Sequence, residues 1–301
     1  MKHLLSLKDL SQSQLLALLE LAQKIKANPA EYRHALDGKN VVMLFEKPSL
    51  RTRVSFDIGI NKLGGHCVYM DQQNGALGKR ESVADFAGNI SQWADAIVAR
   101  TFSHLTIDAL ANTASVPVIN ALSDLYHPCQ ALADLLTLKE VLGDLSHLKL
   151  AYMGDGNNVT HSLMLGVALL GAQMTVICPE GNFPDGFVVT QAQEVAAAHG
   201  GSLLLTPDVS ALENVDAVYT DTWISMGDDT ELSDIEAKFA QYQVNQALME
   251  QYKVKYFMHC LPAHRGVEVT DEVMDGETSL VLQQAQNRMH AQNAVLVTLL
   301  S

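Results

Sequence analysis

The sequence predicts an α/β fold with two doubly wound parallel sheets, helices covering both faces of each sheet, and long helices linking the two domains. Short β-branched runs alternate along the chain with longer segments of helical period. The chain has 301 residues, which at about 150 residues per domain corresponds to two domains. With 48% hydrophobic and 18% charged residues, it can bury a substantial core. A single large barrel also fits this length.

The first predicted element is an amphipathic helix that begins after Ser11. Ser11 followed by Gln14 is a capping-box signal. Asn28 and Pro29 end the segment. Its apolar positions recur at helical spacing: Leu15, Leu18, Leu19, Ala22 and Ile25.

The following elements alternate between strand and helix, which predicts parallel sheets covered by helices. In the first half the predicted strand and helix pairs are Val41–Phe45 with Arg51–Leu63, Ala96–Ala99 with Leu105–Ala114, and Val116–Ile119 with Pro128–Leu142. In the second half they are Leu148–Met153 with Val159–Leu170, and Met174–Cys178 with Gln191–His199, before strands at Ala217–Thr220 and Lys255–Met258. A final helix, Gln283–Leu300, has an apolar face that either half could cover. The most plausible boundary between the halves lies at Gly143–His147.

Charge and cysteine content limit the classes of partner and the expected location. The formal net charge of −14 disfavours general binding to nucleic acid or to anionic membranes, which requires a positive surface. Lys8 and Asp9 interrupt the only sequence that resembles a signal peptide, and apolar stretches such as Leu163–Leu170 are too short to span a bilayer. The four cysteines form no Cys-x-x-Cys pair, so neither a zinc cluster nor a disulfide framework is expected. A cytoplasmic location is the resulting expectation.

Three strand ends in the first half carry groups suited to an anion, because ligands of doubly wound folds collect at the carboxyl ends of strands. Ser49–Arg53 opens a helix with hydroxyl and guanidinium groups in its first turn, where free amides and the helix dipole favour phosphate. A plain N-cap with two surface arginines explains the same residues. Arg100 and His127 follow the next two strands, and each alone is more often structural. Together they could bind a phosphate and polarise a carbonyl oxygen.

The strand end at Gly154–Asn158 resembles a dinucleotide-binding turn in part. Gly154 and Gly156 fit the fingerprint, and Glu180 stands where a ribose-binding acid would be. Val159 occupies the third glycine position, which weakens this interpretation. The paired amides suit hydrogen bonding to a small polar substrate.

Two further strand ends bear Asp221 and Cys260. Asp221 is a natural partner for a substrate ammonium group. Cys260 is a nucleophile, an ammonium contact or an inert buried thiol. Because adjacent strand residues point to opposite faces, His259 is poorly placed to activate it. On its own, Arg288 on the last helix is expected to be an ordinary exposed arginine.

Taken together, these motifs resemble the aspartate/ornithine carbamoyltransferase family over nearly the whole chain, and most closely its members that act on ornithine. The family signature Ser-x-Arg-Thr-Arg matches Ser49–Arg53, its strand-end Arg matches Arg100, and its His-Pro-x-Gln matches His127–Gln130. The ornithine-type motifs match Asn157–Asn158, Asp221 with Ser225–Gly227, His259–Pro262 and Arg288. Jointly these motifs are highly specific.

The resemblance implies transfer of the carbamoyl group of carbamoyl phosphate to the δ-amine of L-ornithine, giving L-citrulline and phosphate, in arginine metabolism. It implies carbamoyl-phosphate contacts from Ser49, Leu50, Arg51, Thr52, Arg100, His127, Gln130, Cys260, Leu261 and Arg288. It implies ornithine contacts from Asn158, Asp221, Ser225 and Met226, with Arg51, Arg100, His127, Asp221 and Cys260 as the catalytic group.

The resemblance also implies no metal, no organic cofactor, and a homotrimer or a multiple of one. The last helix of family members returns to the first domain. The expected domains are therefore residues 1–143 with 283–301 for carbamoyl phosphate, and residues 144–282 for ornithine.

Two positions depart from the family pattern. Leu50 replaces a common Thr, which leaves only its backbone donor. Ala76 replaces a Gln that reaches a neighbouring subunit's site, a contribution that Lys79 or Arg80 could replace with positive charge.

Three alternatives remain open at this stage: a carbamoyltransferase for acetylornithine or another amine, a nicotinamide-dependent oxidoreductase, and a silent regulatory homologue. Retention of the charged phosphate-site residues argues against the last.

Overall fold

The computed structural model describes residues 1–71, 77–78, 81–223 and 237–301. The chain divides into two compact units: unit 1 is Met1–Leu136 with Gln286–Ser301, and unit 2 is Thr137–Ala285. Each unit contains one parallel sheet, so the predicted fold class is confirmed and a single barrel is wrong. Two helices, α6 (Pro128–Leu142) and α12 (Val281–Leu300), begin in one unit and end in the other.

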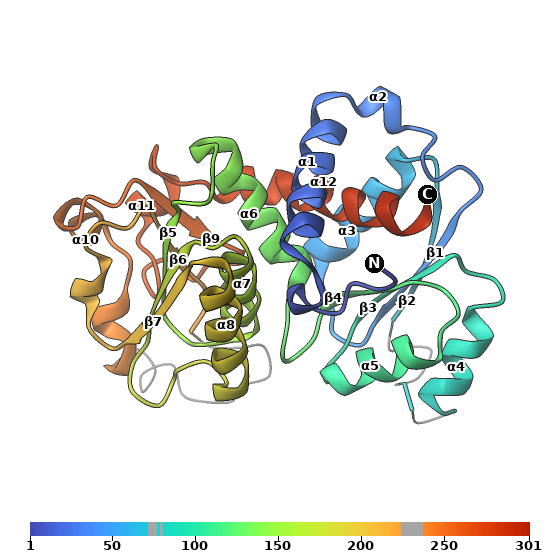
Figure 1. Ribbon diagram of the computed structural model, residues 1–301, viewed down its shortest axis with the longest axis horizontal. Helices are drawn as coiled ribbons and strands as arrows, with labels where there is room; N and C mark the ends of the chain where they lie inside the picture. The colour runs from blue at the N-terminus through green and yellow to red at the C-terminus, as the bar shows by residue number, and fades with distance from the viewer. Residues whose placement is uncertain (72–76, 79–80, 224–236) are drawn as a thin grey trace. The chain divides into compact units, whose positions relative to one another are not determined.

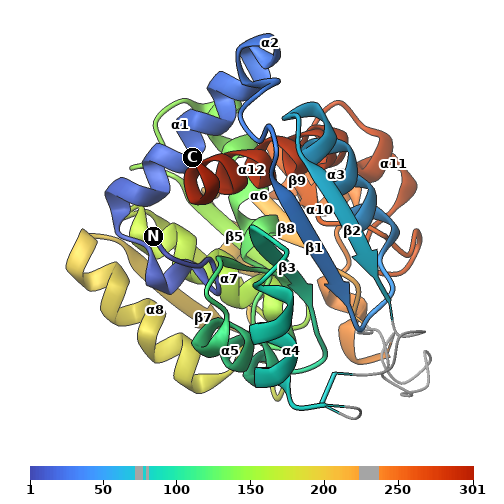
Figure 2. The same ribbon diagram turned by 90° about the vertical axis from the view of Figure 1, so that its right-hand side faces the viewer.

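Unit 1 is built on a four-stranded sheet with the order β2-β1-β3-β4. Its strands are β1 (Asn40–Phe45), β2 (His66–Met70), β3 (Ala96–Arg100) and β4 (Val118–Leu122). Its helices are α1 (Gln12–Ala27), α2 (Pro29–Tyr32), α3 (Leu50–Lys62), α4 (Val83–Ile90) and α5 (His104–Thr113). Helices α4 and α5 lie side by side (Figure 2). The N-terminal segment extends the sheet, because Leu4 pairs in parallel with Ile119 of β4.

Unit 2 is built on a five-stranded sheet with the order β7-β6-β5-β8-β9. Its strands are β5 (Lys149–Met153), β6 (Gln173–Ile177), β7 (Ser202–Thr206), β8 (Ala217–Thr220) and β9 (Tyr256–His259). Its other helices are α7 (Asn158–Leu169), α8 (Gly186–His199), α10 (Gln246–Gln251) and α11 (Asp271–Asp275). Helices α7 and α8 pack against each other (Figure 1).

The predicted elements match the observed ones where the pattern is strongly apolar. The capping box of α1 is present in both directions, and α6 and β8 have the predicted bounds. Strand β4 begins two residues later than expected, after Pro117, which has no backbone N–H to contribute. The edge strands β2 and β7 are not among the predicted elements, since their apolar runs, Cys67–Met70 and Leu203–Leu205, are short and their residues are partly exposed.

Both sheets reverse their strand order at one point, between β1 and β3 in unit 1 and between β5 and β8 in unit 2. The carboxyl ends of the strands beside such a point are the usual place for a ligand. In unit 1 the backbone pairing continues past the strands, since the Glu46 N–H donates to the Arg100 carbonyl at 2.8 Å. The strand ends beside the reversal in unit 1 are therefore held in fixed register.

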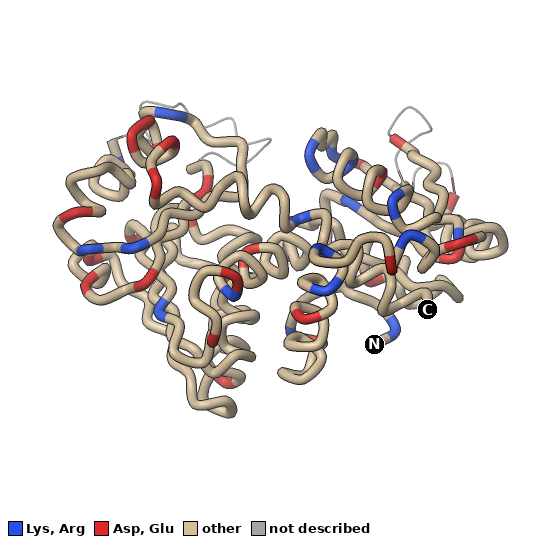
Figure 3. The backbone as a smooth tube through the Cα atoms, turned by 90° about the horizontal axis from the view of Figure 1, so that it is seen from above, with Lys and Arg blue, Asp and Glu red and all other residues tan. Residues whose placement is uncertain are grey.

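The distribution of charge and of apolar helices can be followed over the described residues. Acidic and basic residues are interspersed through both units (Figure 3). Among the described residues, we find no helix with the length and apolar character that crossing a membrane requires.

Candidate active site

The start of α3 forms the first part of the site in unit 1. Ser49 has extended backbone, and its hydroxyl accepts a hydrogen bond from the Thr52 N–H at 3.3 Å, which caps the helix. The Leu50 side chain is 77% exposed and Arg51 is also exposed, whereas Thr52 is buried. This helix end therefore combines first-turn amides with an exposed guanidinium group, as an anion site requires.

A buried cluster centred on Arg288 forms the second part. Its guanidinium group donates to the Gln130 side-chain carbonyl and, at 2.8 Å, to the Thr52 hydroxyl. It also lies 3.3 Å from Nε2 of His127. All four side chains are buried. Helix α12 thus brings Arg288 to the starts of α3 and α6, and this residue is not the exposed arginine that its sequence context alone suggests.

The electrostatics of this cluster favour an anion. Burial lowers the pKa of His127 well below its usual value, and the charges of Arg288 and Arg100 lower it further. The imidazole is therefore neutral, and its contact with Arg288 makes Nε2 the acceptor, which leaves the proton on Nδ1. Burial and the charge of Arg100 also lower the pKa of Lys47, although Asp124 opposes this. Several cations share this strand edge, and a bound dianion would relieve their mutual repulsion.

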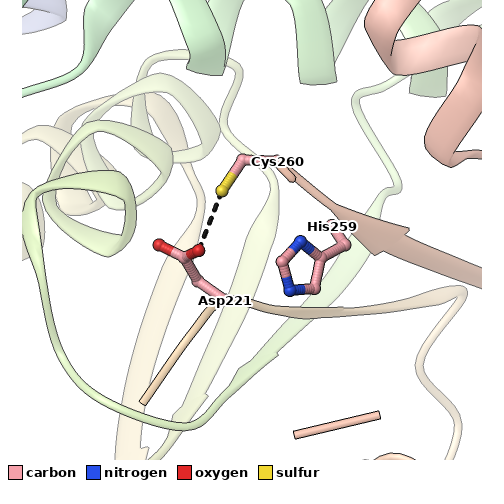
Figure 4. A group of neighbouring side chains, drawn as sticks. All are labelled: Asp221, His259 and Cys260. Atoms are coloured by element: carbon pink, nitrogen blue, oxygen red, sulfur yellow. Dashed lines mark hydrogen bonds between the residues drawn. The ribbon is translucent and has the colours of Figure 1, made fainter. Parts of the chain in front are cut away.

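The site residues of unit 2 surround Asp221, which follows β8. This buried carboxylate accepts hydrogen bonds from the Cys260 thiol at 2.9 Å, the Thr222 N–H at 2.8 Å and the Asn157 amide at 2.9 Å. Figure 4 shows the thiol of Cys260 directed at Asp221. Three donors hold the carboxylate in one orientation.

Asn157 has two functions in this arrangement. Its side-chain oxygen caps α7 by accepting from the N–H groups of Val159 and Thr160, while its amide nitrogen donates to Asp221. The sequence predicted that both amides hydrogen-bond to a substrate, and the resemblance named Asn158, the first residue of α7; the contact of Asn157 with Asp221 was not predicted. The N-cap position between a strand and an apolar helix is the signal that would have found it.

His259 is engaged on both ring nitrogens. Its Nε2 lies 3.2 Å from the buried Glu268 carboxylate, and its Nδ1 accepts from the Leu261 N–H at 2.8 Å. The ligand atoms of Asp221, His259 and Cys260 all lie within 4.8 Å of one another, a spacing that fits a metal ion. His259 would have to give up one of its hydrogen bonds to bind one.

The geometry of Gly156 bears on the dinucleotide alternative. A Cβ atom on this residue would lie 2.3 Å from the backbone nitrogen of Pro184. Close packing of two loops therefore accounts for Gly156 without a pyrophosphate.

Some predicted positions cannot be placed. Ser225 and Met226, predicted to contact the amine substrate, lie outside the described residues, as do Ala76, Lys79 and Arg80. The structure brings together Thr52, His127, Gln130 and Arg288 in unit 1, and Asp221 with Cys260 in unit 2.

Comparisons with known proteins match both units. Residues 2–140 match the family model for the carbamoyl-P binding domain of aspartate/ornithine carbamoyltransferase, and residues 146–299 match that for its Asp/Orn binding domain. The chain is 73% identical to an ornithine carbamoyltransferase of Shewanella oneidensis over the full length of both. A solved ornithine carbamoyltransferase from Pyrococcus furiosus is 46% identical with a TM-score of 0.95, covering 98% of this chain and 96% of that one. An acetylornithine transcarbamylase complexed with acetylcitrulline is 30% identical with a TM-score of 0.91, covering 100% of both.

Proposed function

The chain belongs to the aspartate/ornithine carbamoyltransferase family, and from this premise we propose that it transfers the carbamoyl group of carbamoyl phosphate to the δ-amine of L-ornithine. The products are L-citrulline and phosphate. One observation carries this proposal. The same chain has buried cationic side chains at the site of unit 1 and a buried carboxylate at the strand ends of unit 2.

Unit 1 binds carbamoyl phosphate. The phosphate is held by the first turn of α3 and by Arg100, while His127 and Gln130 hold the carbamoyl group. Bidentate guanidinium donors match phosphate oxygens, and buried donors act more strongly than exposed ones. The full set that the family resemblance assigns to carbamoyl phosphate is Ser49, Leu50 through its amide, Arg51, Thr52, Arg100, His127, Gln130, Cys260, Leu261 and Arg288.

Unit 2 binds ornithine. The Asp221 carboxylate is oriented by three donors, one of which is the Cys260 thiol, and it can accept a hydrogen bond from the substrate amine. We assign Asn158, Ser225 and Met226 to the remaining polar contacts with ornithine. Asn157 positions Asp221.

The reaction needs no covalent enzyme intermediate. The neutral δ-amine attacks the carbonyl carbon, the C–N bond forms, and the tetrahedral intermediate expels phosphate, which can take the proton. Each preorganised donor to the developing oxyanion contributes about 3 kcal/mol. Holding both reactants together removes roughly 7–11 kcal/mol of entropic barrier. Arg51, Arg100, His127, Asp221 and Cys260 are the catalytic group.

Acetylornithine is the second candidate substrate, because a structural neighbour is an acetylornithine transcarbamylase. The relative named for ornithine shares 73% identity against 30% for that neighbour, which favours ornithine.

We further propose that the enzyme acts in the cytoplasm, in arginine biosynthesis, as a homotrimer or a multiple of one. The free cysteines are compatible with a reducing compartment. Val54 and Ile58 of α3 and Val68 of β2 are 42%, 46% and 44% exposed, and a second copy of the chain could cover these apolar side chains. Light scattering on the purified protein would measure the mass of the assembly, and a monomeric mass would contradict this proposal.

Product formation tests the proposed activity. The protein is mixed with carbamoyl phosphate and either ornithine, acetylornithine or putrescine, and the carbamoylated products are measured. We expect citrulline from ornithine with far slower reactions of the other amines. Equal or faster turnover of acetylornithine would overturn the substrate assignment, and binding of NADH in a titration would revive the oxidoreductase alternative.

A further inference from the structure

The loop that carries His127 is organised by the hydroxyl group of Ser123. This loop runs from Ser123, just after β4, to His127, just before α6. The Ser123 N–H donates to the Tyr126 carbonyl at 2.9 Å, and the Tyr126 N–H donates back to the Ser123 hydroxyl at 3.2 Å. The result is a tight turn whose last residue, Tyr126, is bonded directly to His127. Ser123 and Tyr126 are both fully buried.

His104 fixes the hydroxyl of Ser123 from outside the loop. Its Nδ1 lies 2.9 Å from the Ser123 oxygen, which already accepts from Tyr126 N–H and, at 3.4 Å, from the Asn120 amide. The hydroxyl has two acceptors within reach, His104 Nδ1 at 2.9 Å and the Tyr126 carbonyl at 3.5 Å. Because the contact with Nδ1 is much the shorter, we assign the hydroxyl proton to His104. Nδ1 is then an acceptor and the imidazole is neutral.

Further contacts join the loop of His127 to the loop that follows Arg100. The Asp124 carboxylate accepts the backbone N–H of His104, the first residue of α5, at 2.7 Å. The Thr101 N–H donates to the Leu122 carbonyl at 3.0 Å. The rings of His104 and Tyr126 pack edge to face, with their centroids 4.9 Å apart. Two strand-end loops that carry proposed substrate contacts are thus locked to each other.

We propose that the Ser123–His104 hydrogen bond is a positioning device for catalysis, which holds His127 and Arg100 at the separation that the carbamoyl-transfer step requires. Ser123 and His104 are positioning residues that act through His127 and touch no substrate. The inference rests on the proposed function, because the reaction defines what must be positioned. A displacement of about 1 Å at a reacting group can lower a rate by about 100-fold, so such a device has a measurable effect.

The device requires neutral His104. If this imidazole were protonated, Nδ1 would present an N–H to an oxygen that already accepts two others. Burial lowers the pKa of His104, and the charge of Lys8 lowers it as well, while Asp108, Asp124 and Asp9 oppose the shift. The hydrogen bond is therefore fully present above the unfolded pKa of about 6.5 and is lost as the pH falls through the folded value.

The first test compares Ser123→Ala with Ser91→Ala. Ser91 is a control in unit 1, since its hydroxyl likewise donates to one group, the Ala87 carbonyl, and accepts from a backbone amide, the Ser115 N–H. We expect kcat of Ser123→Ala to fall about 10- to 100-fold while KM for ornithine stays within about twofold, because ornithine binds to unit 2. Ser91→Ala should lower the melting temperature without changing kcat. Unchanged kcat in Ser123→Ala, or an equal loss in Ser91→Ala, overturns the proposal.

The second test uses His104, and remains available if Ser123→Ala fails to fold. The carbonyl oxygen of an asparagine can replace Nδ1 as an acceptor, whereas leucine cannot. His104→Asn should keep kcat within about threefold of the wild type, and its kcat should no longer fall at acidic pH through titration of His104. The kcat of His104→Leu should be about 10- to 100-fold lower than that of the wild type. Equal impairment of the two variants contradicts a positioning role.

A measurement without turnover separates this inference from the proposed function. In protein with isotopically labelled histidine, the ring proton resonance of His127 should move in Ser123→Ala and return towards the wild-type position in His104→Asn. An unmoved resonance overturns the positioning role. Absence of citrulline formation by the wild type would overturn the proposed function and leave this spectroscopic comparison decisive.

Discussion

The two units carry buried side chains of opposite charge at the strand ends of similar parallel sheets. In unit 1 the strand ends present Arg100 and His127, with Arg288 added from α12. In unit 2 they present Asp221, held by Cys260 and Asn157. Helix-capping residues are common to both, since Ser49 caps α3 and Asn157 caps α7. The fold therefore fixes where a ligand binds, while a few side chains at the strand ends fix its charge.

The largest expected effect is on the cationic side. Arg100→Ala should lower kcat/KM for carbamoyl phosphate about 100- to 1,000-fold, because it removes a buried donor that acts on both the bound phosphate and the transition state. The kcat/KM of Arg100→Lys should lie between the values of the wild type and Arg100→Ala, since lysine keeps the charge but loses the bidentate geometry. Steady-state kinetics with varied carbamoyl phosphate provide the measurement. Arg33→Ala, an exposed arginine of the same unit, is the control, and a comparable loss there would rule out a specific role for Arg100.

The second prediction concerns the anionic side. Asp221→Asn should raise KM for ornithine about 10- to 100-fold and leave carbamoyl-phosphate binding unchanged. The neutral amide cannot pair with an ammonium group, and its own NH₂ would face the donor of Asn157. Isothermal titration with each substrate distinguishes the two sites. If Asp221→Asn weakened the binding of carbamoyl phosphate as strongly as that of ornithine, the assignment of one substrate to each unit would be wrong.

A smaller effect is expected at Cys260. Cys260→Ser keeps a donor to Asp221 and should retain about a tenth of wild-type kcat, because the thiol is a contact and not a nucleophile. Cys260→Ala should be less active. Complete loss of turnover in a folded Cys260→Ser variant would contradict the contact role of the thiol.

The smallest effect is a change in pKa without a large change in fold. Arg100→Gln should raise the pKa of His127, because one of the positive charges that lower it is removed. A depressed histidine pKa contributes stability above the unfolded value of about 6.5, and this contribution is lost as the pH falls. The variant should therefore lose less stability than the wild type between neutral and acidic pH. Histidine NMR titration measures the shift, and a lowered pKa in the variant would contradict this electrostatic account.

The sequence predicted the parts of this molecule whose patterns are local. Alternating apolar runs predicted both sheets, and the capping box of Ser11 and Gln14 predicted the start of α1. Edge strands β2 and β7 were missed, because a strand exposed on one side carries a weaker apolar signal than a central one.

The functional assignments depended on long-range contacts to a greater extent. Arg288 was assigned only through resemblance, since nothing in its neighbourhood predicts burial beside Thr52 and Gln130. Likewise, no spacing rule links His104 to Ser123, which are brought together only by the pairing of β3 with β4. Side chains that meet through tertiary structure leave no period in the sequence.

The path of the chain also imposes an order on biosynthesis. Unit 1 is completed by residues 286–301, which the ribosome adds only after the whole of unit 2. At about 5–20 residues per second, the nascent first segment waits on the order of 10 s for Arg288 to emerge. During that interval the partners of Arg288, Thr52 and Gln130, exist without the guanidinium group that joins them. The anion site therefore cannot be assembled in this form before all of unit 2 and Arg288 have been synthesised.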